Sequence, residues 1–244
     1  MSDNERHSFL TFSCFNNIVI NRYHIHKGTS MQEKILTNMS ELNTRTKILH
    51  AAKQEFFDKG FANANVRIIA KKAGVTTGAL YNLFKNKDSI FEVLVGTVFD
   101  EFLHILSHHD VLAAKDTDMR TGELSAITEV SQLRFSRIVD FFYANWDAMK
   151  LIVCCARGSS YEHIFDKAIE LIETETIKLL KYDNIQMSCR RTFFIHVMVT
   201  SHFENLKEIF YHDLEKTEAL AYMLDFSTYH CAGWKQYWIE QIDE

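Results

Sequence analysis

Hydrophobic positions recur at the spacing of an α-helix from residue 44 onward, whereas residues 1–42 show no sustained period. The first periodic stretch predicts an amphipathic helix with an N-cap at Asn43 or Thr44. Gly60 is expected to end this helix, because glycine readily takes the backbone conformation that stops one. The apolar positions of the predicted helix are Ile48, Leu49, Ala51, Ala52, Phe56 and Phe57.

Two short helices follow, separated by a short turn. The first covers residues 66–72 with Asn65 as its cap, and Gly74 breaks it. Thr76 caps the second, which extends to Phe84. The residues expected to face inward are Ile69, Ala70, Ala73, Leu80 and Phe84. This spacing is typical of a helix-turn-helix, whose second helix enters the major groove of DNA.

The pattern beyond residue 87 predicts a series of longer helices. Asp88 is expected to cap a helix that extends to about residue 108, and a polar loop containing Gly122 follows. Four further helices are predicted over residues 133–155, 161–182, 185–211 and 214–242. The chain is therefore predicted to be all-α.

Composition permits this fold without deciding it. The 244 residues include no proline, which leaves the backbone free to form long helices, but an AT-rich coding sequence would produce the same shortage. No apolar run reaches the roughly 18 residues that a membrane span requires. Residues 9–20 lack the small-residue cleavage site of a signal peptide. We therefore expect a cytoplasmic protein with no membrane partner.

Charge divides the chain more sharply than its net value of −5 suggests. Residues 44–87 contain nine basic and two acidic side chains, a net charge of +7, so the remainder carries −12. A basic segment on an acidic body is the electrostatic pattern of a nucleic-acid-binding module attached to a second domain. A solvated basic face would look similar, so charge alone does not settle the matter.

Residues 46–94 also match a known pattern at its proper spacings. The residues concerned are Thr46-Lys-Ile-Leu-His-Ala-Ala52, Phe56-Phe57, Gly60-Phe61, Val66-Arg67, Ile69-Ala70, Ala73-Gly-Val-Thr76, Gly78, Leu80-Tyr81, Phe84-Lys-Asn-Lys87 and Ile90. This stretch resembles the DNA-binding segment of the tetracycline-repressor (TetR) family of bacterial transcriptional regulators. The stretch 226–234 resembles, more loosely, the last helix of many members.

The resemblance implies three regions in the chain. Residues 43–89 would form a helix-turn-helix DNA-binding domain, and residues 90–244 a helical ligand-binding and dimerisation domain. Residues 1–42 are expected to be an N-terminal extension, either a disordered arm or a segment upstream of a natural start at Met31 or Met39.

The expected DNA contacts follow from the chemistry of the second short helix and from the resemblance. Thr76 suits a phosphate at a helix N-terminus, and Gly78 has no side chain to hold the backbone away from the duplex. Thr77 and Ala79 would meet base edges in the major groove. The contacts implied by the resemblance alone are Arg45 or Thr46 on phosphate, Arg67 on the flanking groove edge, and Tyr81, Asn82 and Lys87 on phosphates.

Departures from the family pattern leave the operator sequence open. Ile68 stands where an acidic residue commonly completes a capping box with residue 65. Thr77, Ala79, Asn82 and Leu83 replace residue types that are more frequent in the family.

A short recognition helix reads only a few base pairs, so we expect a homodimer on a pseudo-palindromic, double-stranded operator. The resemblance places the dimer face on residues 185–211 and 214–242, and it implies a small apolar or amphipathic effector that releases the DNA. The predicted effector-binding residues are Phe102, Ile105, Leu106, Phe142, Trp146, Met149, Cys154 and Phe165. Ordinary core packing is the alternative role for each.

Two rival functions stay open at this point. One is a metal or redox sensor that uses His104 with His108 and the pair Cys154–Cys155. The other is a DNA-binding regulator controlled by a protein partner. The five cysteines show no CxxC spacing, and the signatures of hydrolases, P-loops and dinucleotide-binding sites are absent from the sequence. We therefore predict no enzymatic activity, no cofactor and no metal.

Overall fold

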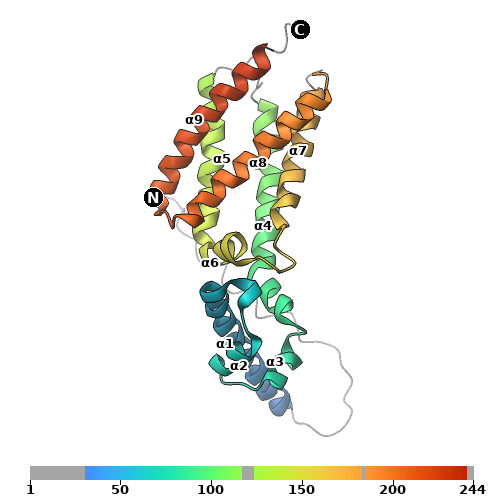
Figure 1. Cartoon of the computed structure of the whole chain (residues 1–244), viewed down its shortest axis with the longest axis vertical. Helices are drawn as coiled ribbons and strands as arrows, with labels where there is room; N and C mark the ends of the chain where they lie inside the picture. The colour runs from blue at the N-terminus through green and yellow to red at the C-terminus, as the bar shows by residue number, and fades with distance from the viewer. Residues whose placement is uncertain (1–30, 117–123, 183–184, 241–244) are drawn as a thin grey trace, which may run out of the picture. The chain divides into compact units, whose positions relative to one another are not determined.

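The computed structural model describes residues 31–116, 124–182 and 185–240, and these residues form helices and turns without a strand. This confirms the predicted all-α class. The elements are α1 (Met31–Asn63), α2 (Val66–Lys72), α3 (Thr77–Leu83), α4 (Lys87–Asp116), α5 (Leu124–Ala144), α6 (Trp146–Lys150), the π-helix η1 (Leu151–Cys155), α7 (Ile164–Tyr182), α8 (Cys189–Tyr211) and α9 (Lys216–Glu240) (Figure 1).

The chain divides into two compact units, residues 1–42 and 43–244. All contacts reported below lie within the second unit. The boundary predicted between residues 89 and 90 falls inside α4 and stays a prediction.

The helix α1 begins at Met31, so the predicted N-cap at Asn43 or Thr44 is wrong. Residues 31–42 are rich in good helix formers, and extending an existing helix requires no apolar stripe. The predicted break at Gly60 is confirmed, because Gly60 has φ 69° and ψ 162° and interrupts the helix. These angles are accessible almost only to glycine.

The structure confirms α2 and α3 at their predicted positions. Asn65 accepts a hydrogen bond from the Arg67 amide at 2.9 Å, and Thr76 accepts one from the Ala79 amide at 3.1 Å. Each cap satisfies an amide that has no partner inside its own helix.

The cap predicted for α4 is wrong by two residues. Asn86, not Asp88, precedes the helix, and its side chain accepts from the Ser89 amide at 2.8 Å. The Ser89 hydroxyl oxygen accepts in return from the Asn86 amide at 3.2 Å. The helix also continues beyond residue 108 to Asp116, and Gly122 of the predicted loop lies outside the described residues.

The helix predicted over residues 133–155 is three elements. α5 begins earlier, at Leu124, and ends where Asn145 leaves helical geometry with φ −124° and ψ 31°. The Asn145 side chain donates to the Phe141 carbonyl at 3.1 Å, so this carbonyl has a hydrogen-bond partner where the helix breaks. α6 and η1 follow. The later helices α7, α8 and α9 begin two to four residues after their predicted starts.

Aromatic side chains form much of the core. α5 packs along α9 and α7 packs along α8, as Figure 1 shows. The core continues from these helices into α1–α4 through buried residues that include Phe56, Phe91, Phe99 and Phe102. Among the described helices, none is both long enough and apolar enough to cross a bilayer.

Candidate nucleic-acid interface

The turn between α2 and α3 is held by the backbone itself. The Val75 amide donates to the Ala70 carbonyl at 3.0 Å, and the Gly74 amide donates to the Lys71 carbonyl at 3.1 Å. Together with φ 70° at Gly74, these bonds form a Schellman motif, which requires a left-handed residue after the helix. The turn therefore sets α3 at a defined angle to α2 without side-chain help.

The first turn of α3 presents a surface that the rest of the protein does not cover. Thr76 Oγ1 accepts from the Ala79 amide and so keeps its own hydrogen for another acceptor, such as a phosphate oxygen. Gly78 is exposed, and a Cβ added there would meet nothing closer than Thr76 Oγ1 at 3.9 Å. No crowding inside the protein thus requires glycine at this position.

The two faces of α3 separate as predicted. Leu80 and Phe84 are buried, which confirms them as core residues. Tyr81 is 49% exposed and Asn82 is exposed, while Thr77 and Ala79 are partly exposed. The structure therefore places the predicted contact residues of α3 on its accessible side.

The other predicted contacts come from α1 and α2. The Arg45 guanidinium carbon lies 4.5 Å from the centre of the Phe84 ring, a cation–π contact that places it beside the end of α3. Thr46 lines an open groove of about 530 Å³ between α1 and the α2–α3 turn, together with Lys47 and His50. Arg67, at the start of α2, is exposed.

Lys87 is placed differently from the prediction. Its Nζ donates to the carbonyl oxygens of Phe61 at 2.6 Å, Ala62 at 3.2 Å and Ala64 at 3.1 Å, and it lies 4.5 Å from the centre of the Phe61 ring. An ammonium group has three hydrogens, so these bonds use all of its donors. Burial lowers the pKa of Lys87. The geometry gives Lys87 the role of closing the end of α1 rather than of contacting phosphate.

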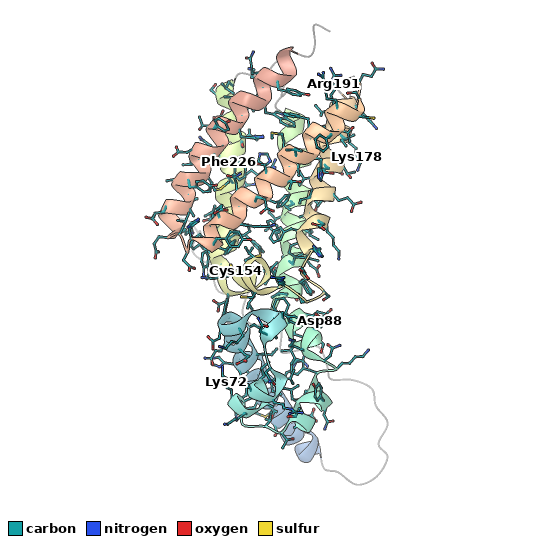
Figure 2. The ribbon with its side chains drawn as sticks, viewed as in Figure 1. Lys72, Asp88, Cys154, Lys178, Arg191 and Phe226 are labelled. Carbon is teal, nitrogen blue, oxygen red and sulfur yellow. The ribbon has the colours of Figure 1, made fainter. Side chains whose placement is uncertain are left out.

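Glu55 is an important residue that sequence reasoning missed. It is 3% exposed, and its carboxylate accepts from Lys72 Nζ at 2.9 Å and, at 3.5 Å, from the Asn65 amide. In a capping box an acidic residue at position 68 would accept from that amide, but Ile68 cannot. α1 thus supplies the acceptor that α2 lacks. The hydrogen bond to Glu55 raises the pKa of Lys72, which is labelled in Figure 2.

The structure brings most of the predicted effector-binding residues together as packed core. The Phe102 ring lies 5.4 Å from that of Phe142 and 6.4 Å from that of Phe165. Leu106 and Met149 are buried, and Ile105 and Trp146 are half-buried. Cys154 is exposed, with its sulfur 3.9 Å from the Phe210 carbonyl oxygen. Their role in binding stays a prediction.

The described residues give the metal and redox alternatives no support. No group of three or more His, Cys, Asp or Glu side chains in this part of the chain could hold a metal ion. The side chain of His108 lies outside the described residues, and His104 is exposed. Burial raises the pKa of the Cys154 thiol to about 11 and also raises that of Cys155, which disfavours the reactive thiolate.

A half-buried histidine pair, whose Nε2 atoms are both buried, lies where α8 meets α9. The rings of His202 and His230 are 3.9 Å apart at their centres, and neither Nε2 atom has a hydrogen-bond partner among the described atoms. Burial, followed by His230 and Arg134, lowers the pKa of His202 well below its ordinary value. Burial and then Arg134 lower the pKa of His230 to about 4. Both rings are therefore neutral at pH 7. Their separation of 28 positions in the sequence offered no signal of this contact.

Residues 48–94 match the family model described as bacterial regulatory proteins, tetR family. Over 62 residues the chain is 36% identical to the HTH-type transcriptional regulator TtgR of Pseudomonas putida, covering 25% of this chain and 30% of that protein. Over 52 residues it is 35% identical to the HTH-type transcriptional regulator UidR of Escherichia coli, covering 21% of this chain and 26% of that protein. The chain thus spans less than a third of the length of these relatives.

The transcriptional regulator FadR from Bacillus subtilis, solved in complex with stearoyl-CoA, superimposes with a TM-score of 0.48 at 16% identity, covering 75% of this chain and 97% of that one. The match to the family model falls on the segment that contains α2, the Schellman turn and α3. Residues 48–94 of this chain therefore form a segment of the tetR family of bacterial regulatory proteins.

Proposed function

We propose that this protein is a transcriptional repressor that binds a pseudo-palindromic operator as a homodimer and is released by a small apolar or amphipathic effector. The observation that carries the proposal is the exposed first turn of α3. The Thr76 hydroxyl caps this turn but keeps its own hydrogen, Thr77 is partly exposed, and the turn lies within a segment of net charge +7. Such a surface fits the major groove of DNA.

Each exposed residue has a distinct role in this proposal. Thr76 donates its hydroxyl hydrogen to a phosphate at the N-terminus of α3, where the helix dipole also favours an anion. Thr77 and Ala79 read base edges, and Gly78 allows the backbone to approach the duplex. Tyr81, beyond the first turn, positions α3 on the phosphate backbone.

The remaining contacts flank α3. Arg45, Thr46 and Arg67 extend the contact along the backbone and the groove edge, and Asn82 joins Tyr81 on phosphate. Lys87 is left out of this set, because its donors are already bonded to carbonyl groups.

Exposed apolar side chains on α8 and α9 support the proposed homodimer. Phe193 is 68% exposed and Val197 40% on α8, while Leu224 is 40% and Tyr229 82% exposed on α9. Association of these faces between two copies would remove this apolar surface from water and present two α3 helices to two half-sites. Analytical ultracentrifugation tests this: Tyr229→Lys should shift the protein toward monomer, because it places a charge in the apolar face.

The aromatic cluster around Phe102, Phe142 and Phe165 supports an apolar effector. These rings would have to separate to admit a ligand, so binding would favour a second arrangement of the helices around them. An effector can shift the protein between two such states only by its difference in affinity for them. Release of DNA therefore requires an effector that prefers the state with weaker operator affinity.

The proposal is tested by selecting DNA duplexes from a randomised pool with the purified protein. The affinity of the protein for the most enriched duplex is then measured by fluorescence anisotropy. Thr77→Ala is expected to relax base preference. Arg45→Ala should instead weaken binding to all DNA sequences alike and reduce the slope of log affinity against log salt concentration by about 0.9. Lys178→Ala is the control. It also removes one positive charge, but from α7, where Lys178 pairs with Glu175 (Figure 2). Failure to enrich any duplex over the starting pool would refute DNA recognition.

A further inference from the structure

Besides α4 itself, a second segment connects the aromatic cluster to the DNA-binding helices. α6 and η1 contain Trp146, Met149 and Cys154, three of the predicted effector-binding residues. The turn over residues 156–163 follows directly and leads into α7. A displacement of α6 or η1 by a ligand would therefore be passed to this turn over only a few residues.

The turn itself is rigid. The Ser159 amide and hydroxyl both donate to the Ala156 carbonyl, at 2.9 and 2.6 Å, and the Ser159 hydroxyl oxygen accepts from the Tyr161 amide at 3.0 Å. Gly158 adopts φ 84°, and its amide donates to Glu162 Oε2 at 3.0 Å. A turn closed by this many internal bonds moves as one body.

This rigid turn contacts both α1 and α4. A Cβ added at Gly158 would lie 3.4 Å from the Ala62 side chain of α1, so the two backbones approach closely there. The Ser160 amide donates at 2.9 Å to Asp88, which Figure 2 labels near the start of α4. The preceding α6 makes a further link, in which Lys53 of α1 donates to Asp147 at 2.6 Å.

Tyr161, in the same turn, packs against Gly96 in the first third of α4. A Cβ at position 96 would lie 2.8 Å from the Tyr161 hydroxyl oxygen, closer than real Cβ atoms approach, so the Tyr161 side chain would have to shift. Glycine inside a helix costs roughly 0.5–1 kcal/mol relative to alanine, so its presence there needs a reason. The Tyr161 ring also lies 6.0 Å from that of Phe91, which in turn packs on Phe56 and Phe61 of α1.

We propose that Tyr161, seated against Gly96, is the positioning residue through which the C-terminal helices hold α4 and thereby set the operator affinity of α3. The proposal rests on the proposed DNA-binding function and adds its regulation. α4 directly follows α3, and its residues Ile90 and Phe91 belong to the core on which α3 is seated. A change at the contact of Tyr161 with Gly96 therefore alters the placement of α3 without touching any DNA contact.

A π-helix in this position supports a switch. A π-helical turn is a local irregularity in an α-helix that recurs at functional sites. η1 directly precedes the rigid turn, so a return of η1 to α-helical geometry would rotate the turn relative to α6. Such a two-state element is what transmission between sites requires.

The test is a pair of substitutions with a built-in rescue, made in the full-length protein. Gly96→Ala introduces the methyl that the Tyr161 hydroxyl excludes, and we expect affinity for the duplex selected by the wild-type protein to fall at least fivefold. Adding Tyr161→Phe removes the oxygen 2.8 Å from that methyl and leaves the nearest ring carbon at 3.9 Å, so the double variant should return to within twofold of wild type.

Stability is measured in parallel to separate positioning from folding. Gly233→Ala is the control for a helical glycine, because nothing lies within 4 Å of a Cβ at that position. Should Gly96→Ala fail to fold, Tyr161→Leu provides the test. It removes the aromatic ring and hydroxyl that lie against Gly96, and it should weaken DNA binding at least threefold.

The outcomes distinguish the two proposals. If the wild-type protein binds its duplex and Gly96→Ala binds equally well, or Tyr161→Phe does not restore binding, the positioning role is overturned while the proposed function stands. If the wild-type protein enriches no duplex, the proposed function fails and the positioning role fails with it.

Discussion

We expect the histidine pair between α8 and α9 to make the stability of this protein sensitive to mild acid. His230 has its pKa lowered from 6.5 to about 4, so in the folded protein it stays neutral at pH values where the unfolded chain binds a proton. The unfolded state thus gains protons first, and the free energy of unfolding falls as pH decreases from 6.5 to about 4. Above pH 6.5 both states are neutral and the penalty is absent.

The magnitude follows from linkage between protonation and folding. The difference between 6.5 and about 4 corresponds to roughly 3 kcal/mol once both states have titrated, at about 1.4 kcal/mol per unit. At pH 5 the folded protein has bound little of this proton, and the penalty is already about 2 kcal/mol. The pKa of His202 is lowered in the same direction, so it adds to the loss.

Urea unfolding followed by circular dichroism at pH 7.5 and 5 measures this effect. In His230→Phe the drop in unfolding free energy between these two pH values should be smaller by about 2 kcal/mol than in the wild-type protein. Phenylalanine suits the site, because the His230 ring stacks between those of Phe226 and Trp234. His163→Asn, at an exposed position, serves as the reference for loss of a histidine. Equal drops in the wild-type protein and His230→Phe would refute the reasoning.

Substitutions at three further positions test the helix-turn-helix domain. Lys87→Met should lower the unfolding free energy by about 2–3 kcal/mol, because three carbonyls lose a charged donor, and should leave the salt slope of DNA binding unchanged; a slope reduced by about 0.9 would instead indicate a phosphate contact. Thr76→Ala should cost about 1 kcal/mol through the lost cap, measured by thermal unfolding, while Thr76→Ser should retain it. Gly60→Ala should cost about 1–3 kcal/mol in urea unfolding, and Gly60→Asn should give no rescue, because φ 69° with ψ 162° excludes both side chains.

The helix-turn-helix illustrates what a local pattern predicts well. The caps at Asn65 and Thr76 and the turn at Gly74 depend on bonds between residues that are at most five positions apart. Such bonds form wherever the right residue types stand at the right spacing, so sequence reasoning located α2 and α3 correctly. The periodic apolar positions likewise predicted Leu80 and Phe84 as core.

Helix ends after α3 were predicted less well, because competing local signals look alike in the sequence. Asp88 and Asn86 are both suitable caps, and only the reciprocal bonds with Ser89 distinguish them. Asn145 lies inside a stretch of continuous apolar periodicity, and that periodicity concealed the break between α5 and α6.

The sequence by itself determined the all-α class, the match of residues 48–94 to the tetR family, and the residue types on the exposed side of α3, because these depend on short-range spacing and on one contiguous motif. Only the tertiary structure decided how distant polar groups pair. Lys87 caps α1 from 23 to 26 residues away, and Glu55 completes the cap of α2 from ten residues away. A buried polar group takes whichever partner the packing of the helices brings within about 3 Å, and that packing is a property of the whole fold rather than of any local pattern.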